Sequence, residues 1–356
     1  MKRILIVLTN PRTSEKIIPV IPELSKEFEL DCLMMAQCSL NTPWPGDIDE
    51  REVFIATYSN YFDKIINGPG IKYHGDSLNG HLVDYVDMNR YDLILLDDNR
   101  TLPQFQLPSL YQRAKAKGIP VVGNSHGNQD PASMIQDLGF NVSYDKLFVL
   151  GKYEKEILMR YHDDEQLILS GIPANDKLKP LLNKSGKYLL VVTNFLSNRY
   201  SPFSVNFNEK WVEHIKKTAN GNMVVIKQKT RLDDPNYKKN EQYLKDVYPE
   251  ANVVTNTDDL NMLVSESYAV VGAYSTLMFK ALQLRKPTFL IDGSGQVGNF
   301  ANWKHHGTAD KMAQSIYDQM TNTHSGDAEK FLLETLHGGI DFSAKKSYIK
   351  ELKKLV

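Results

Sequence analysis

The sequence predicts an α/β protein built from two doubly wound domains, each with a parallel sheet. Short, continuous apolar runs alternate with segments of helical apolar spacing along most of the chain. Unbroken apolar runs of this length are typical of parallel strands that are buried on both faces. The alternation of strand-like and helix-like segments begins again after the polar segment Lys179–Gly186, and 356 residues are enough for two such domains. We therefore expect one domain over 1–178 and another over 179–342, with a final helix, 343–356, that can cross back onto the first.

The first predicted domain begins with a strand at Ile4–Leu8, because Asn10, Pro11 and Arg12 end the apolar run too early for a signal peptide. The later predicted strands of this domain are Leu30–Met34, Leu93–Leu96, Pro120–Val122, Lys146–Leu150 and Leu167–Leu169. The predicted helices are Ser14–Glu27, Val53–Ile66, His81–Met88, Leu107–Lys117 and Tyr153–Tyr161. Pro19 and Pro22 weaken the first of these helices, since a proline inside a helix removes a hydrogen bond.

The second predicted domain repeats the alternation of strands and helices. Its predicted strands are Tyr188–Thr193, Met223–Ile226, Val253–Val254, Ala269–Val271 and Thr288–Ile291. Its predicted helices are Glu209–Ala219, Asn240–Val247, Leu260–Ser265, a helix from about Thr276 to Lys286, Ala309–Met320 and Ala328–Leu336.

The segment Ala269–Ile291 is the clearest strand–helix–strand unit of the chain. Gly272 ends its first strand, and the hydroxyl residues Ser275 and Thr276 stand where a helix N-cap is expected. The free N–H groups and the dipole of a helix N-terminus form a site for an anion, typically a phosphate. An ordinary N-cap explains the same residues, and the sequence leaves both interpretations open.

Composition excludes several classes of protein. Lys plus Arg is 42 and Asp plus Glu is 43, so no net charge draws the chain towards nucleic acid or an anionic membrane. The two cysteines, Cys32 and Cys38, form neither a metal-site pattern nor a disulfide framework. No apolar run approaches the roughly 20 residues of a membrane span. We expect a cytosolic protein, with peripheral membrane contact left open. The absence of a G-x-G-x-x-G or P-loop pattern argues against a simple dehydrogenase or a P-loop NTPase.

Three short motifs, in this order, resemble those of one superfamily. They are Asn124–Gly127 (NSHG), Gly171–Asp176 (GIPAND) and Ala273–Phe279 (AYSTLMF). Together they are similar to the GT-B group of nucleotide-sugar and nucleotide-alcohol transferases. The CDP-glycerol glycerophosphotransferase family of teichoic acid and capsule synthesis is the nearest match. The Ala269–Ile291 unit also resembles the transferase that adds N-acetylglucosamine in peptidoglycan synthesis, through Gly272, Ala273, Gln296 and Asn299.

The resemblance implies two Rossmann-like domains that face a cleft, with the acceptor side in the first domain and the nucleotide donor in the second. It implies a metal-independent transferase without a cofactor, acting on a nucleotide-linked donor and a glycan or lipid-linked hydroxyl acceptor in surface polysaccharide or glycoconjugate synthesis. The chain departs from the family pattern at Ala273, where the family has aspartate, and at Lys280, where many relatives have a ribose-binding glutamate. Val225–Lys229 also lacks the donor histidine of the glycerophosphotransferases.

That missing histidine favours sugar transfer over glycerophosphate transfer. The alternatives are a CDP-glycerol-type glycerophosphotransferase, a nucleotide-sugar 2-epimerase, and a GT-B binding module that has lost catalysis. The epimerase requires several acids and a histidine around the sugar, a set that the sequence does not assemble. The departures at Ala273 and Lys280 favour the binding module.

We expect the chemistry at His126, which follows a strand of the first domain and has the unperturbed pKa, about 6.5, of a general base. Asp98, with Asp97 beside it, is the alternative base. The donor phosphates are expected at Tyr274, Ser275, Thr276, Lys227 and Lys229, and other cleft positions at Asn124, Gly127, Asn194, Gln296 and Asn299. A purely structural role also explains each of these residues. His126 would then belong to a turn, Ser275 would only cap a helix, and Lys227 and Lys229 would form a solvent-exposed basic edge. His305 and His306 are expected to be surface histidines without a metal.

Overall fold

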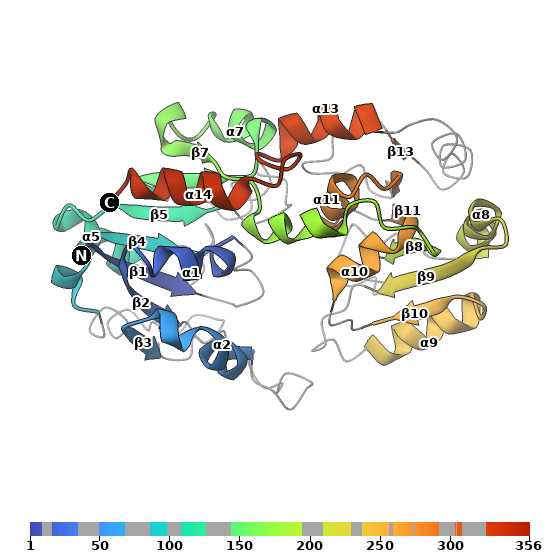
Figure 1. The fold of residues 1–356 in the computed structure, drawn as a ribbon, viewed down its shortest axis with the longest axis horizontal. Helices are drawn as coiled ribbons and strands as arrows, with labels where there is room; N and C mark the ends of the chain where they lie inside the picture. Colours follow the sequence, from blue (N-terminus) through green and yellow to red (C-terminus); the bar gives the residue numbers. More distant parts are fainter. Residues whose placement is uncertain are drawn as a thin grey trace. The chain divides into compact units, whose positions relative to one another are not determined.

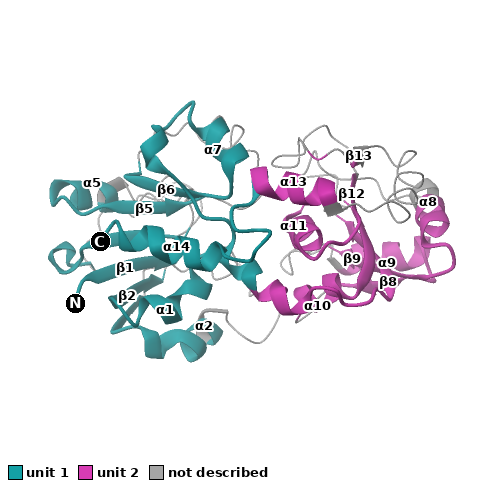
Figure 2. Cartoon of the chain, turned by 45° about the horizontal axis from the view of Figure 1, so that its top comes forward, with its two compact units in different colours: residues 1–176, 335–356 teal, residues 177–334 magenta. Residues whose placement is uncertain are grey.

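The computed structural model describes residues 1–8, 16–34, 50–67, 86–97, 108–125, 144–193, 209–228, 237–255, 259–272, 275–291, 303, 305–307 and 325–356. The chain divides into two compact units, shown in different colours in Figure 2. Unit 1 comprises Met1–Asp176 together with Thr335–Val356, and unit 2 comprises Lys177–Glu334.

Unit 1 is built on a seven-stranded parallel sheet in the order β3-β2-β1-β4-β5-β6-β7. Its strands are β1 (Arg3–Leu8), β2 (Glu29–Met34), β3 (Lys64–Asn67), β4 (Leu93–Leu96), β5 (Val121–Asn124), β6 (Lys146–Val149) and β7 (Leu167–Leu169). The strand order reverses between β1 and β4, which makes the sheet doubly wound. In such a sheet, ligands bind outside the carboxyl ends of the strands at the reversal.

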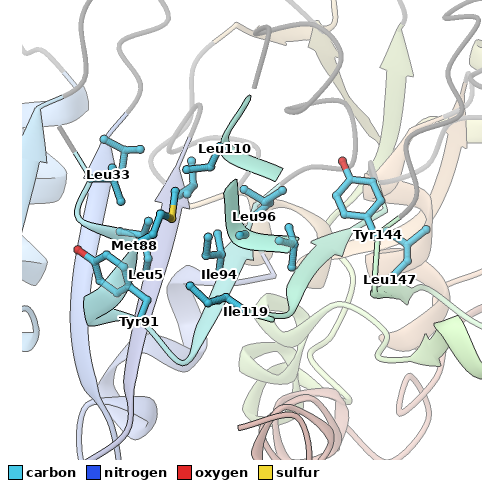
Figure 3. Packing of buried hydrophobic residues seen from close by; sticks show 14 of the residues in the cluster. Leu5, Leu33, Met88, Tyr91, Ile94, Leu96, Leu110, Ile119, Tyr144 and Leu147 are labelled. Carbon is cyan, nitrogen blue, oxygen red and sulfur yellow. The ribbon is translucent and has the colours of Figure 1, made fainter. Parts of the chain in front are cut away.

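Apolar clusters cover both faces of this sheet, as expected for strands that are unbroken apolar runs. Figure 3 shows one cluster, in which Leu5, Ile94 and Leu96 of the strands pack against Leu110 of α5 (Pro108–Ala116). The other face carries the remaining side chains of β1 and β4, packed under η1 (Ile18–Val20), α1 (Ile21–Leu24) and α2 (Glu50–Tyr58).

The C-terminal helix α14 (Ala344–Lys353) lies beside α1 and the strands of unit 1 in Figure 1. Its Tyr348 is fully buried and stacks on Phe148 of β6, with ring centroids 4.2 Å apart. On its outer side Lys345 pairs with Glu23 at 2.7 Å. The last residues of the chain thus complete the core of the unit that the first residues begin.

The GIPAND segment packs against the chain that returns to unit 1. Gly171 has a φ of +67°, and a Cβ there would lie 2.0 Å from the main-chain oxygen of His337, so only glycine fits. The carboxylate of Asp176 accepts hydrogen bonds from the main-chain N–H groups of Ala344 and Lys345, at 3.3 and 2.8 Å. Asp176 therefore caps α14 from a distant part of the sequence.

Unit 2 has a six-stranded parallel sheet among its described residues, in the order β10-β9-β8-β11-β12-β13. Its strands are β8 (Tyr188–Thr193), β9 (Met223–Gln228), β10 (Asn252–Val254), β11 (Ser267–Gly272), β12 (Thr288–Ile291) and β13 (His306–Gly307). The helices are α8 (Glu209–Ala219), α9 (Tyr237–Val247), α10 (Leu260–Ser265), α11 (Thr276–Gln283) and α13 (Ser325–Thr335). The order reverses between β8 and β11, so this sheet is also doubly wound.

The structure corrects several predicted elements. The prolines reduce the helix predicted over Ser14–Glu27 to η1 and the single turn of α1. The helix predicted over Val53–Ile66 ends at Tyr58, and its last residues belong to η2 (Ser59–Tyr61) and β3 instead. The 3-10 helix η5 (Pro173–Leu181) overlaps the first residues of the polar segment Lys179–Gly186. Most of the predicted helix at His81–Met88 and all of the one at Ala309–Met320 lie outside the described residues.

Candidate functional site

The carboxyl end of β5 in unit 1 is held by buried polar groups. Asn124 is the last residue of β5 and is fully buried. Its side-chain nitrogen donates a hydrogen bond of 2.8 Å to the main-chain oxygen of Leu96, at the end of the adjacent strand β4. Asp97, the next residue after β4, is 2% exposed, and its main-chain N–H donates to Val7. The ends of β1, β4 and β5 are therefore tied together at the edge where a doubly wound sheet binds ligands.

Ser125 continues from Asn124 and contacts two buried ionisable residues. The ammonium group of Lys16 donates to the main-chain oxygen and to the hydroxyl of Ser125, both at 2.7 Å. The Ser125 hydroxyl in turn donates to Oε2 of Glu154, at 3.1 Å. Glu154 lies in the first turn of α7 (Lys152–Leu158), and its Oε2 also accepts the main-chain N–H of Leu150.

Burial dominates the electrostatics of this cluster. Lys16, Ser125 and Glu154 are 4%, 4% and 3% exposed. Burial raises the pKa of Glu154 above its ordinary value, while the nearby Lys16 and the hydrogen bonds from Leu150 and Ser125 act in the opposite direction. One serine hydroxyl thus bridges the amine of Lys16 and the carboxyl of Glu154, and the serine directly precedes His126 in the sequence.

In unit 2 the corresponding edge is formed by the ends of β8 and β11. A Cβ on Gly272, the last residue of β11, would lie 2.2 Å from the main-chain oxygen of Val192 in β8. The glycine therefore permits a close approach of the two strands at the reversal point. Three residues later, Ser275 is the N-cap of α11, and its hydroxyl accepts a weak hydrogen bond of 3.4 Å from Leu277. Thr276 is the first helical residue, and its side chain is half-buried, as is that of Ser275.

Lys227 lies at the end of β9 and is engaged by the main chain. Its ammonium group donates to the carbonyl oxygens of Gln228 and Thr255, each at 2.7 Å, and so joins β9 to the end of β10. Burial lowers its pKa below the ordinary value for lysine. Thr255 is held in addition by Glu241 of α9, whose carboxylate accepts its hydroxyl at 2.6 Å. These contacts give Lys227 a structural role, and its predicted contact with phosphate stays a prediction.

The structure describes only part of the predicted site. Asn124, Ser275, Thr276 and Lys227 lie at the carboxyl edges of the two sheets, as does Asp97. The other predicted residues lie outside the described part: His126, Asp98, Gly127, Asn194, Lys229, Tyr274, Gln296 and Asn299. Sequence reasoning missed Lys16 and Glu154. The signal for Glu154 was its position four residues before Leu158, which places a carboxyl on the buried face of a helix.

His305 differs from the surface histidine that the sequence led us to expect. Its side chain is 18% exposed, and its Nε2 lies 3.0 Å from a carboxylate oxygen of Asp327 in α13. Its ring also packs against the buried indole of Trp303, with centroids 4.9 Å apart. The pairing of His305 with a carboxylate on a later helix could not be read from the local sequence.

Neither a metal site nor a membrane span is present in the part of the chain that the structure describes. No three His, Cys, Asp or Glu side chains among the described residues are grouped so as to hold a metal ion. Within the same residues, every helix is too short or too polar to cross a bilayer.

Comparisons with known proteins give structural but not sequence matches. No protein-family model matches the chain, and no curated protein matches it. The UDP-GlcNAc 2-epimerase of Neisseria meningitidis, solved with UDP-GlcNAc bound, matches at a TM-score of 0.62 and 17% identity, over 99% of this chain and 100% of the other. A glycosyltransferase from Rickettsia africae matches at 0.58 and 14%, over 99% and 97%. A variant of the wall teichoic acid polymerase TagF matches at 0.56 and 12%, over 99% and 89%.

These similarities, all below 25% identity, establish the fold. The chain has the GT-B-like α/β fold, with two Rossmann-like parallel-sheet domains, that epimerases, TagF and glycosyltransferases share. The predicted fold class is confirmed. The three neighbours are enzymes by name, and they differ in the reaction that each catalyses.

Proposed function

We propose that this protein is a glycosyltransferase that moves a sugar from a nucleotide-diphosphate donor to an acceptor hydroxyl. The reaction needs no metal, and it belongs to the synthesis of a surface polysaccharide or glycoconjugate. The observation that carries the proposal is the β11–α11 unit, where Gly272 brings two strand ends together and a hydroxyl-capped helix starts three residues later.

The donor diphosphate binds at the N-terminus of α11 in this proposal. The first N–H groups of a helix have no partner within the helix, and the helix dipole favours an anion there. Ser275 and Thr276 add two hydroxyl donors at the same point. The main-chain N–H of Leu277 donates only a weak hydrogen bond, 3.4 Å long, to the Ser275 hydroxyl. A phosphate oxygen at the helix N-terminus would be a better acceptor for this N–H group. Lys229 and Tyr274 are the further phosphate contacts that we propose.

The acceptor hydroxyl is activated from unit 1 in this proposal. His126 follows directly on Ser125, whose position is fixed by Lys16 and Glu154. A histidine is suited to remove a proton from an alcohol near neutral pH, and one that follows a strand end comes where a doubly wound sheet binds ligands. Asp98, next to the buried Asp97, is the second candidate for the base.

A nucleotide-sugar 2-epimerase is the second candidate, and one observation favours it. The neighbour that carries UDP-GlcNAc is an epimerase by name. A CDP-glycerol-type glycerophosphotransferase is the third possibility, supported by the likeness to TagF and by the GIPAND motif.

One experiment separates these activities. The purified chain is incubated with UDP-GlcNAc, other UDP-, CDP-, GDP- and dTDP-linked sugars, and CDP-glycerol, and the products are resolved by chromatography and NMR. Slow release of nucleoside diphosphate from a sugar donor without acceptor supports the transferase. Conversion of UDP-GlcNAc to its 2-epimer supports the second candidate, and release of CMP from CDP-glycerol supports the third. Nucleotide binding without any turnover identifies a binding module and refutes all three activities.

A further inference from the structure

Every polar group of Ser125 is held by a different part of unit 1. Its N–H donates to the main-chain oxygen of Phe148 in β6 at 2.8 Å, and its main-chain oxygen accepts from Lys16 at 2.7 Å. Its hydroxyl accepts from Lys16 and donates to Glu154. The residue that precedes His126 is therefore fixed by β6, by the segment that follows β1 and by α7.

Contacts of this kind need not add to the stability of the fold. Removing an amine and a carboxyl from water is costly, and a buried ion pair is often no more stabilising than apolar residues of the same volume. Lys16 and Glu154 are each at least 96% buried, and their neighbours in sequence, Ile17 and Leu158, belong to the apolar clusters of unit 1. An arrangement of this cost is expected where a group must be held in one geometry.

We propose that Lys16 and Glu154 are positioning residues: bridged by the Ser125 hydroxyl, they fix the strand end that carries His126. They act through Ser125 and touch no substrate. The inference rests on the proposed function in one respect, because it takes His126 as the group whose position matters. Neither residue belongs to the motifs by which the chain resembles known transferases.

The test is a pair of charge-neutral substitutions that keep the size of both side chains. In the double variant Lys16→Met with Glu154→Gln, no charge is left buried without its partner. We expect it to melt near the wild-type temperature, and each single variant to melt lower. Turnover of the double variant should fall about 100-fold, the effect of a misplacement on the order of 1 Å, with the KM for donor within about twofold of wild type. The matched control is Lys353→Met with Glu27→Gln, an exposed pair at 2.6 Å in the same unit, which should keep full turnover.

A measurement that is independent of activity separates this inference from the proposed function. The chain has nine histidines, and the imidazole resonance of His126 is assigned by its loss in His126→Ala. Its titration should shift in Ser125→Ala, which removes the bridging hydroxyl but no charge, and stay unchanged in the Lys353→Met, Glu27→Gln control. If wild type turns over no donor but the titration shifts, the proposed function fails and the positioning role stands. If wild type is active, the double variant keeps its turnover and Ser125→Ala keeps the wild-type titration, the positioning role is wrong. Should the double variant not fold, Ser125→Ala takes its place in the turnover measurement as well.

Discussion

The close approach of β11 to β8 can be tested by adding one methyl group. In Gly272→Ala the new Cβ would lie 2.2 Å from the main-chain oxygen and 2.8 Å from the Cβ of Val192. The nearest atom belongs to the backbone of a central strand, so it cannot move away as a flexible side chain would. Forcing an extra methyl group into a packed core typically costs about 1–3 kcal/mol. We expect a loss of that size in the free energy of unfolding of unit 2.

The assay is urea unfolding of the variant and of Gly326→Ala, its matched control. Gly326 is the second residue of α13 and has no atom within 4 Å of its added Cβ, so alanine there should not lower the free energy of unfolding. Gly272→Ala should also weaken the binding of UDP or another cognate nucleotide, because the strand end that precedes α11 must shift. A Gly272→Ala variant as stable as wild type, with unchanged nucleotide affinity, would refute the close-approach reasoning.

Three further predictions follow from single contacts. Ser275→Ala with Thr276→Ala should weaken nucleotide affinity measured by calorimetric titration, and loss of the cap should cost about 0.5–2 kcal/mol; unchanged affinity would remove α11 from the donor site. Tyr348→Ala should lower the unfolding free energy of unit 1 by about 3–5 kcal/mol in chemical denaturation, because a fully buried ring stacked on Phe148 is lost; a loss under 1 kcal/mol would contradict that packing. Burial raises the pKa of the Asp176 carboxyl above its ordinary value of 3.8, so the folded state binds this proton more tightly than the unfolded state. The resulting stabilisation is fully present at pH values below the ordinary pKa and declines as the pH rises through the raised pKa. Asp176→Asn should abolish this decline in melting temperatures measured across pH, and a pH profile identical to that of wild type would contradict the role of Asp176.

The sequence was sufficient for the alternation of strands and helices because the signals are local. Tyr188–Thr193 is an unbroken apolar run, and the structure gives it as β8 with the same bounds. The helix after Gly272 has its N-cap at Ser275 and ends before Pro287, as its capping residues indicate. Predicted elements were wrong where a helix signal and a strand signal overlap in the same residues. Ile65 and Ile66 continue the helical spacing of the preceding segment, and only pairing with β2 turns them into β3.

The candidate site was less predictable because its contacts connect distant residues. Lys16 and Ser125 are 109 residues apart, and Ser125 and Glu154 are 29 apart, so no motif spacing indicates that they meet. The same holds for Asp176, which caps a helix that begins 168 residues later. Gly171 and Ser275 could be found because a glycine in a turn and a hydroxyl at a helix start are recognisable in the sequence itself.

The central claim, that this protein binds a nucleotide-diphosphate donor, is tested most directly by a thermal-shift panel. UDP-, CDP-, GDP- and dTDP-linked donors are added to wild type and to the Ser275→Ala, Thr276→Ala double variant. A donor at 100 times its dissociation constant stabilises the folded state by about 2.7 kcal/mol, which is a measurable rise in melting temperature. We predict that one class of donor raises the melting temperature of wild type and that the variant loses most of this rise. No shift with any nucleotide, at concentrations up to the millimolar range, would contradict the proposed function at its foundation.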